Sequence, residues 1–279
     1  NVSNLDEVLS SLKPNATRQR DLVSFLYKNG ATFCEKLNEA YGSSALKSLV
    51  SKGIVTVNSM TVRRTPYSNL IPSDSEKKIL LNEQQKAVDK VLADRSGKFL
   101  LHGVTGSGKT EVYLTVIERI VAEGKTCIML VPEIALTPNM LKQLRNRFGD
   151  KVALLHSGLS IGERYDEWLR LKNEEAQIAI GARSAIFAPL SNVGAIIIDE
   201  EHDSSYISDF NPRYNTIDVA NHRAEQNGAL LLLGSATPSL GSYYAAIKGE
   251  LTLIEMPERI NKRPLPTVEI VDMTEETRS

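Results

Sequence analysis

The chain has 279 residues, which is long enough for one large and one small domain, and its composition, 42% hydrophobic and 24% charged, is typical of a globular protein. Its 33 basic and 34 acidic residues give a formal charge of −1, so net charge alone argues for no partner. Two cysteines, Cys34 and Cys127, exclude a disulfide framework and a zinc site within this chain. No apolar run approaches the roughly 18 residues of a membrane span, and we expect a cytoplasmic protein without a membrane partner.

The first part of the chain has helical patterns followed by two short extended pieces. The helical patterns cover residues 18–28, 34–40 and 43–52, and the extended pieces cover 54–58 and 60–65. Three helices and a hairpin are typical of the winged form of the helix-turn-helix, which predicts a winged-helix domain over residues 17–65. Direct DNA contact and a role as a spacer or protein dock are both open for this domain.

Two linkers are expected to flank the winged-helix domain. Residues 1–16 read as a linker from a preceding domain, and residues 66–80 contain the Pro-rich, Ser-rich and charged stretch that leads into the next one. The missing initiator methionine suggests a piece cut from a longer protein.

Beyond residue 80, apolar strand-like runs alternate with helical patterns. The runs are residues 99–101, 127–131, 152–155, 178–180, 196–198 and 230–233. Such alternation predicts an α/β fold with a parallel sheet covered by helices on both faces, as in a RecA-like P-loop lobe over residues 81–256. Residues 257–279 are expected to connect this lobe to a second one.

A glycine-rich segment follows the first of these strands and has the spacing G-x-x-x-x-G-K-T. Its glycines allow backbone N–H groups to surround phosphate oxygens, Lys109 can reach the outer phosphates, and the Thr110 hydroxyl can bind magnesium as a helix begins. The sequence therefore predicts a nucleoside triphosphate site. Its residues are Gly103, Val104, Thr105, Gly106, Ser107, Gly108, Lys109 and Thr110.

Two adjacent carboxylates, Asp199 and Glu200, end the predicted strand 195–198. Asp199 is the expected magnesium partner, and Glu200 is placed to orient and deprotonate an attacking water, so both join Lys109 as candidate catalytic residues. The next acids, Glu201 and Asp203, are compatible with a solvated acidic turn.

A third polar segment, residues 234–239, follows the last predicted strand. His202 is expected to couple the acidic pair to it through the hydroxyls of Ser235 and Thr237.

These stretches resemble superfamily 2 helicases of the DEAD/DEAH kind and, more closely, the bacterial replication-restart family of primosomal protein N-prime. The likeness covers residues 17–273, and the segments that carry it are residues 103–113, 130–138, 181–190 and 199–206. It implies ATP and Mg²⁺ as cofactors, with zinc only in parts of the parent protein outside this chain. It also implies an adenine contact in residues 81–85, where Glu83 replaces the usual proline. Spacing gives this contact to Gln85, with Gln84 as the alternative.

The resemblance also implies contacts with DNA. Loop residues at Pro132, Thr137, Arg183 and Ser184 would touch the backbone of a single strand, which suits their hydroxyls, amides and guanidinium. An intradomain salt bridge is the alternative for Arg183. The residues of an aromatic-rich loop that would sense DNA are Tyr206, Phe210, Arg213 and Tyr214. These rings can stack on bases or pin the loop to the domain.

By this likeness, the parent protein would be an ATP-dependent 3′–5′ DNA helicase. It would act at stalled or branched replication forks, with forked and single-stranded DNA, primosome proteins and single-strand-binding proteins as partners. The alternatives are another superfamily 2 helicase acting on DNA or RNA, a nucleotide-switched winged-helix DNA-binding protein, and a P-loop kinase. No second-lobe motif follows Ser239, so this chain alone is expected to hydrolyse ATP slowly and not to unwind a duplex.

Overall fold

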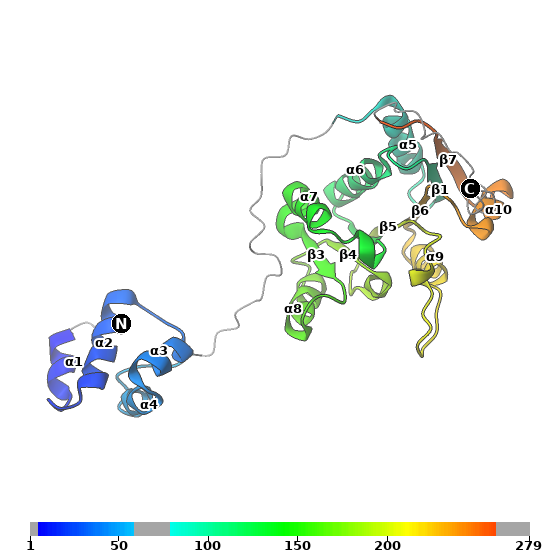
Figure 1. The fold of residues 1–279 in the computed structure, drawn as a ribbon. Helices are drawn as coiled ribbons and strands as arrows, with labels where there is room; N and C mark the ends of the chain where they lie inside the picture. The colour runs from blue at the N-terminus through cyan, green and yellow to red at the C-terminus, as the bar shows by residue number, and fades with distance from the viewer. Residues whose placement is uncertain (1–4, 59–78, 261–279) are drawn as a thin grey trace, which may run out of the picture. The chain divides into compact units, whose positions relative to one another are not determined.

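The computed structural model describes residues 5–58 and 79–260, which belong to two compact units divided between Val62 and Arg63 (Figure 1). None of the helices in these ranges is both long and apolar enough to cross a bilayer.

The first unit is helical. Its elements are α1 (Leu5–Ser11), α2 (Thr17–Asn29), α3 (Cys34–Tyr41) and α4 (Ser43–Ser51). The last three match the predicted helices, whereas α1 was not predicted. Leu12 is buried with residues of α2, α3 and α4, and Leu5, Val8 and Leu9 of α1 pack against the same cluster. Residues 5–12 are therefore part of this unit, and the linker assignment for residues 1–16 is wrong there.

The predicted wing of this unit has no counterpart among the described residues. Residues 54–58 form no strand with any described part of the chain, and residues 60–65 lie outside it. The winged-helix assignment thus depends on three helices and remains a prediction.

The second unit contains a sheet of seven parallel strands. They are β1 (Lys98–Gly103), β2 (Thr126–Leu130), β3 (Val152–Leu155), β4 (Ile178–Gly181), β5 (Val193–Asp199), β6 (Leu230–Ser235) and β7 (Thr252–Met256). Their order across the sheet is β3-β4-β2-β5-β6-β1-β7. The six predicted strands are all present. β7 was not predicted because it is an edge strand with exposed Thr252 and Glu255, so its sequence lacks a continuous apolar run.

Helices cover both faces of this sheet. α5 (Asn82–Ala93), α6 (Lys109–Ala122) and α7 (Pro138–Phe148) lie on one face, and α8 (Ile161–Lys172), α9 (Thr216–Asn227) and α10 (Leu240–Ile247) lie on the other (Figure 1). Successive strand side chains point to opposite faces, so Phe99 and Leu101 join the core with α5 to α7 while Leu100 joins the core with α8 and α9. The predicted α/β architecture with helices on both faces is confirmed.

The strand order decides which loops meet. In a parallel sheet all carboxyl ends lie at one edge, and β5, β6 and β1 are immediate neighbours. The glycine-rich loop after β1, the acidic pair at the end of β5 and the polar segment after β6 therefore converge.

Candidate active site

The glycine-rich loop has a backbone that only glycine adopts easily. Gly106 and Gly108 have φ angles of 84° and 86°, in the left-handed region. At Gly103 the constraint is space, because a Cβ there would lie 2.7 Å from Ser107 Oγ. Helix α6 starts directly after Gly108, so its free N–H groups and the positive end of its dipole belong to this loop. The loop is thus suited to an anion.

Two polar groups in the loop fit the phosphates of a nucleotide. Ser107 Oγ is buried and has no hydrogen-bond partner among the described residues. The buried Lys109 ammonium donates to the Gly103 carbonyl at 2.8 Å and lies 3.8 Å from Glu200 Oε1. A buried hydroxyl without a partner is rare unless a ligand or water completes it. Phosphate oxygens would satisfy both groups, so the residues fit a triphosphate.

The remaining residues of the predicted phosphate site differ in how much of their surface is exposed to solvent. Of these residues, Thr105 and Gly106 are exposed, while Val104, Gly108 and Thr110 are half-buried.

The acidic pair is held by the end of β5 and by helix α6. Asp199 Oδ1 accepts hydrogen bonds from the Tyr113 hydroxyl at 3.0 Å and from the Glu200 N–H at 3.1 Å. Burial, and then the neighbouring Glu200, raise the pKa of Asp199. Glu200 itself has a φ of 46°, a left-handed conformation that costs energy in a residue with a side chain. Such strain and crowding are typical of acids held for a function.

A cation would relieve the repulsion between these two carboxylates. Thr110 and Asp199 are the residues that would hold Mg²⁺, since hard oxygen ligands suit it. When bound, this ion would neutralise phosphate charge.

His202 joins the acidic segment to the segment after β6. Its Nδ1 lies 2.8 Å from Ser235 Oγ and its Nε2 lies 3.4 Å from Thr237 Oγ1. The Thr237 N–H also donates to Ser235 Oγ at 3.0 Å. The structure brings the three predicted coupling residues together, and their role in coupling remains a prediction.

Glu201 is a site residue that sequence reasoning missed. It is only 2% exposed, and its carboxylate accepts hydrogen bonds from the Ser239 N–H at 2.7 Å, the Ser239 hydroxyl at 3.1 Å and the Ser242 hydroxyl at 2.9 Å. Its own N–H donates to the Gly234 carbonyl at 3.0 Å. Glu201 therefore ties the acidic segment to the start of α10 and is not part of a solvated turn.

The other acid of this turn, Asp203, is half-buried, and hydrogen bonds from Ser205 lower the pKa of its carboxyl. The sequence signal for Glu201 was weak, because its partner Ser239 lies 38 residues further along the chain.

The glutamine beside the phosphate loop is Gln84. Its Nε2 donates to the Ser107 carbonyl at 3.3 Å, its Oε1 accepts the Leu81 N–H at 2.8 Å, and the residue is 3% exposed. Gln85 is exposed and donates to Asp89 one turn along α5 at 2.8 Å. Neighbouring helix residues point about 100° apart, so only one of the two can face the loop. Gln84 therefore lies beside the phosphate loop, and the choice between Gln85 and Gln84 for the adenine contact remains a prediction.

Among the residues expected to contact a DNA backbone, Thr137 and Ser184 are exposed and Pro132 is buried. Thr137 Oγ1 also accepts the Met140 N–H at 3.3 Å and so caps α7. Arg183 donates to the carbonyls of Ile207 at 2.8 Å and Ser205 at 3.4 Å. Neither contact is the salt bridge considered from the sequence. Arg183 instead braces the loop that contains the aromatic residues.

Tyr206 lies inside the protein rather than on the aromatic-rich loop's surface. It is 1% exposed, belongs to the apolar core beside α9, and its hydroxyl donates to the Asp199 carbonyl at 2.7 Å. A ring in that position has no free face for a base, so the DNA-stacking prediction for Tyr206 is wrong. The signal was ambiguous because a tyrosine in a polar segment looks the same in sequence whether its ring is buried or exposed.

The other residues of this loop are accessible. Phe210 is 78% exposed and Arg213 is exposed, while Tyr214 is half-buried with its ring edge-to-face on Phe187 at 5.2 Å between centroids. The loop is closed by a bridge between Ile207 and Asn215. Phe210, Arg213 and the half-buried Tyr214 therefore remain candidates for contact with a nucleic acid.

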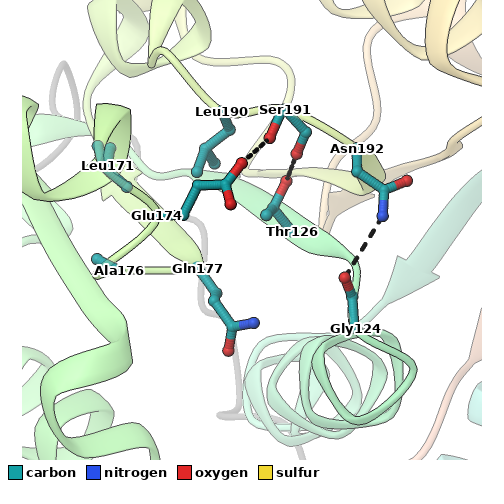
Figure 2. Close-up of a pocket in the computed structure, with 9 residues that line it drawn as sticks. All are labelled: Gly124, Thr126, Leu171, Glu174, Ala176, Gln177, Leu190, Ser191 and Asn192. Atoms are coloured by element: carbon teal, nitrogen blue, oxygen red, sulfur yellow. Dashed lines mark hydrogen bonds between the residues drawn. The ribbon is translucent and has the colours of Figure 1, made fainter.

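A separate cavity of about 200 Å³ lies at the opposite end of the sheet (Figure 2). It is formed where β2, β4 and β5 begin, and several of its polar groups bond to one another. Ser191 Oγ donates to Glu174 at 2.7 Å, Thr126 Oγ1 donates to the Ser191 carbonyl at 2.7 Å, and Asn192 Nδ2 reaches the Gly124 carbonyl at 3.4 Å. None of the predicted site residues lines it. The candidate active site is accordingly the carboxyl edge.

Comparison with known proteins gives a family and several relatives for this chain. Residues 82–244 match the family described as DEAD/DEAH box helicase. The replication restart protein PriA of Bacillus subtilis (strain 168) is 44% identical over 279 residues, which cover 96% of this chain and 34% of that protein. The PriA protein of Synechocystis sp. is 42% identical over 276 residues, which cover 96% of this chain and 33% of that protein. The chain thus spans about a third of the length of these relatives.

A solved structure shares the fold. The structure of RecG bound to a three-way DNA junction superposes with a TM-score of 0.54 and 23% identity, covering 72% of this chain and 27% of that one. The family match covers more than half of the chain and includes the phosphate loop, the acidic pair and the segment after β6. The chain belongs to the DEAD/DEAH box helicase family.

Proposed function

We propose that this chain is the ATP-binding part of an ATP-dependent DNA helicase of replication restart. The observation that carries the proposal is the meeting of the phosphate loop and the acidic pair, with Lys109 Nζ 3.8 Å from Glu200 Oε1 at the carboxyl edge of the sheet. A partly buried acid beside a lysine and an unpaired loop hydroxyl suits a charged, hydrolysable ligand.

The roles of the site residues follow from their positions. Lys109 neutralises the outer phosphates in place of the Gly103 carbonyl that it now contacts. Glu200 acts as the base toward water, and Tyr113 orients Asp199 through its hydroxyl. His202 transmits a conformational change at the acidic pair to Ser235 and Thr237, which lie in the segment that leads into α10.

The same edge of the sheet offers a path for a nucleic-acid strand. Thr137, Ser184 and the loop with Phe210 and Arg213 expose hydroxyls, an aromatic ring and a guanidinium, which suit a phosphate backbone and stacked bases without reading a sequence. Because Arg183 holds that loop through the Ile207 carbonyl, a strand that displaced Arg183 would also move the loop. Such a movement would reach Asp199, because Tyr206 is next to Ile207 in the chain and its hydroxyl donates to the Asp199 carbonyl.

The whole protein's role is proposed from the relatives, which are replication restart proteins. In this proposal the full-length protein moves 3′ to 5′ on DNA at stalled forks, with primosome and single-strand-binding proteins as partners. A second lobe supplies arginines that contact the γ-phosphate. In related phosphoryl-transfer enzymes such an arginine increases kcat by a factor of about 10³ to 10⁵. The 279-residue chain alone is then a slow ATPase.

The test is ATP hydrolysis by the protein extended to the length of its relatives, with no nucleic acid, single-stranded DNA, forked DNA or RNA. We expect DNA, and forked DNA most, to stimulate turnover, and Lys109→Ala to abolish it. Stimulation by RNA instead of DNA would assign the chain to another branch of the family. Normal hydrolysis by the Lys109→Ala variant would refute the site itself.

A further inference from the structure

The segment that follows β7 returns to the phosphate loop. β7 pairs in parallel with β1, with Met256 opposite Gly103, so both strands end at the same edge. The Val104 N–H donates to the Met256 carbonyl at 3.2 Å, and the Ile260 N–H donates to the Gly106 carbonyl at 3.0 Å. Residues 257–260 therefore run beside the glycine-rich loop and are held to it by main-chain hydrogen bonds.

The side chain of Ile260 meets that of Gln84 over Gly108. A Cβ placed on Gly108 would lie 2.8 Å from Ile260 Cδ1 and would overlap Gln84 Nε2. The two side chains come from separate elements, one from α5 and one from the segment after β7. They thus lie next to each other beside the phosphate loop.

Ile260 is not explained by packing in the core. Ile254 and Met256 of β7 are buried in the core beside α5 and α6, whereas Ile260 is 45% exposed. An exposed aliphatic side chain is ordinary by itself. Here, however, its position is fixed by a backbone hydrogen bond to the phosphate loop, and its neighbour is a buried amide.

The chemistry of a nucleotide accounts for both side chains. With the phosphates held by the glycine loop, the base needs a polar partner for its edge and an apolar surface for its ring face. In the Gln84 amide, Nε2 already donates to the Ser107 carbonyl and Oε1 already accepts the Leu81 N–H, which leaves one N–H and one lone pair for the base edge. We propose that Ile260 is the apolar platform on which the base of the bound nucleotide packs. This inference rests on the proposed ATP site and adds a specificity-determining residue from outside the phosphate loop.

The test compares a ligand that has a base with one that has none. Calorimetry on the 279-residue chain would measure binding of Mg²⁺-ATP and of Mg²⁺-tripolyphosphate to the parent, to Ile260→Ala and to Ile260→Leu. We expect Ile260→Ala to weaken ATP binding about tenfold, as for loss of most of one aliphatic contact, and to leave tripolyphosphate within about twofold. Ile260→Leu keeps an apolar surface and is expected to retain ATP binding.

Ile247→Ala is the matched control, because Ile247 is also an exposed isoleucine but lies at the end of α10. It should change neither ligand's affinity. Unchanged or tighter ATP binding by Ile260→Ala would overturn the inference, as would equal weakening of both ligands, which would show that the segment only shapes the loop. If the parent chain bound neither ligand, the proposed nucleotide site would fail along with the platform.

Discussion

The hydroxyl of Tyr113 donates a hydrogen bond to Asp199 Oδ1 at 3.0 Å and so joins helix α6 to the acid at the end of β5. Burial, followed by the charge of Asp199, raises the pKa of Tyr113 well above its usual value, so this hydroxyl stays protonated and remains a donor. We expect Tyr113→Phe to lower the free energy of unfolding by about 2 kcal/mol, because a hydrogen bond to a charged group contributes roughly 1.5–3 kcal/mol. Urea unfolding measures this.

The control for that variant is Tyr165→Phe, on the exposed surface of α8, which should leave the unfolding free energy unchanged. We also expect Tyr113→Phe to lower kcat for ATP more than it raises KM, since Asp199 loses its orientation and the phosphate loop is untouched. Equal stability of both variants would contradict a functional Tyr113–Asp199 bond.

Gly234 is required by the position of Tyr113. A Cβ on Gly234 would overlap the Tyr113 hydroxyl oxygen and lie 2.7 Å from its Cζ. Because Gly234 in β6 and Tyr113 in α6 are both buried and cannot move apart freely, Gly234→Ala should destabilise the fold by about 3 kcal/mol. Gly241→Ala is the control, since nothing lies within 4 Å of its added Cβ and alanine favours the helix by roughly 1 kcal/mol. Thermal unfolding should move the two variants in opposite directions.

Gln84 and Gln85 form a natural pair for testing the nucleotide contact. Gln84 is buried against the Ser107 carbonyl, whereas Gln85 is exposed and bonded to Asp89. We expect Gln84→Ala to raise the dissociation constant for ATP about tenfold, through loss of the base contact, and Gln85→Ala to leave it within twofold. Fluorescence titration with a labelled ATP analogue would measure both. A larger effect at Gln85 would give the base contact to Gln85 instead.

Glu201 is expected to hold α10 in place, because that helix has no buried residue of its own. Glu201→Ala removes the acceptor of the Ser239 N–H and of two serine hydroxyls, so we expect a loss of about 3 kcal/mol. In the same variant, hydrogen exchange of the α10 backbone amides should be faster than in the parent protein. Glu250→Ala, an exposed acid, should change stability by less than about 0.5 kcal/mol. Unchanged exchange in α10 would show that another contact anchors the helix.

Tyr206 and Phe210 should separate structure from function in the aromatic-rich loop. Tyr206→Ala empties a buried site, and we expect a loss of about 4 kcal/mol in unfolding free energy. Phe210→Ala removes an exposed ring, so stability should change by less than about 0.5 kcal/mol. In the full-length protein, however, Phe210→Ala should reduce DNA stimulation of ATP hydrolysis severalfold. Full stimulation in that variant would exclude Phe210 from the DNA path.

The sequence by itself determined six of the seven strands, all except β7, and the chemistry of the loops that follow them. Residues 127–131 and 196–198 are continuous apolar runs because a strand that is covered by helices on both faces has no solvent-exposed face that would need polar side chains. The phosphate loop was predictable because its glycines, Lys109 and Thr110 are fixed by local spacing. The acidic pair was predictable because it ends such a strand.

Only the tertiary structure decided the contacts between segments that are distant in the chain. Strand β7 is an edge strand whose partner, β1, lies some 150 residues earlier. The Glu201 carboxylate accepts a hydrogen bond from the Ser239 N–H, 38 residues further along the chain. The rotation of α5 decided that Gln84, and not Gln85, lies against the phosphate loop, and the burial of Tyr206 depended on the packing of α9. Local pattern fixes what a residue can do, but which partner it meets is set by how helices and strands pack.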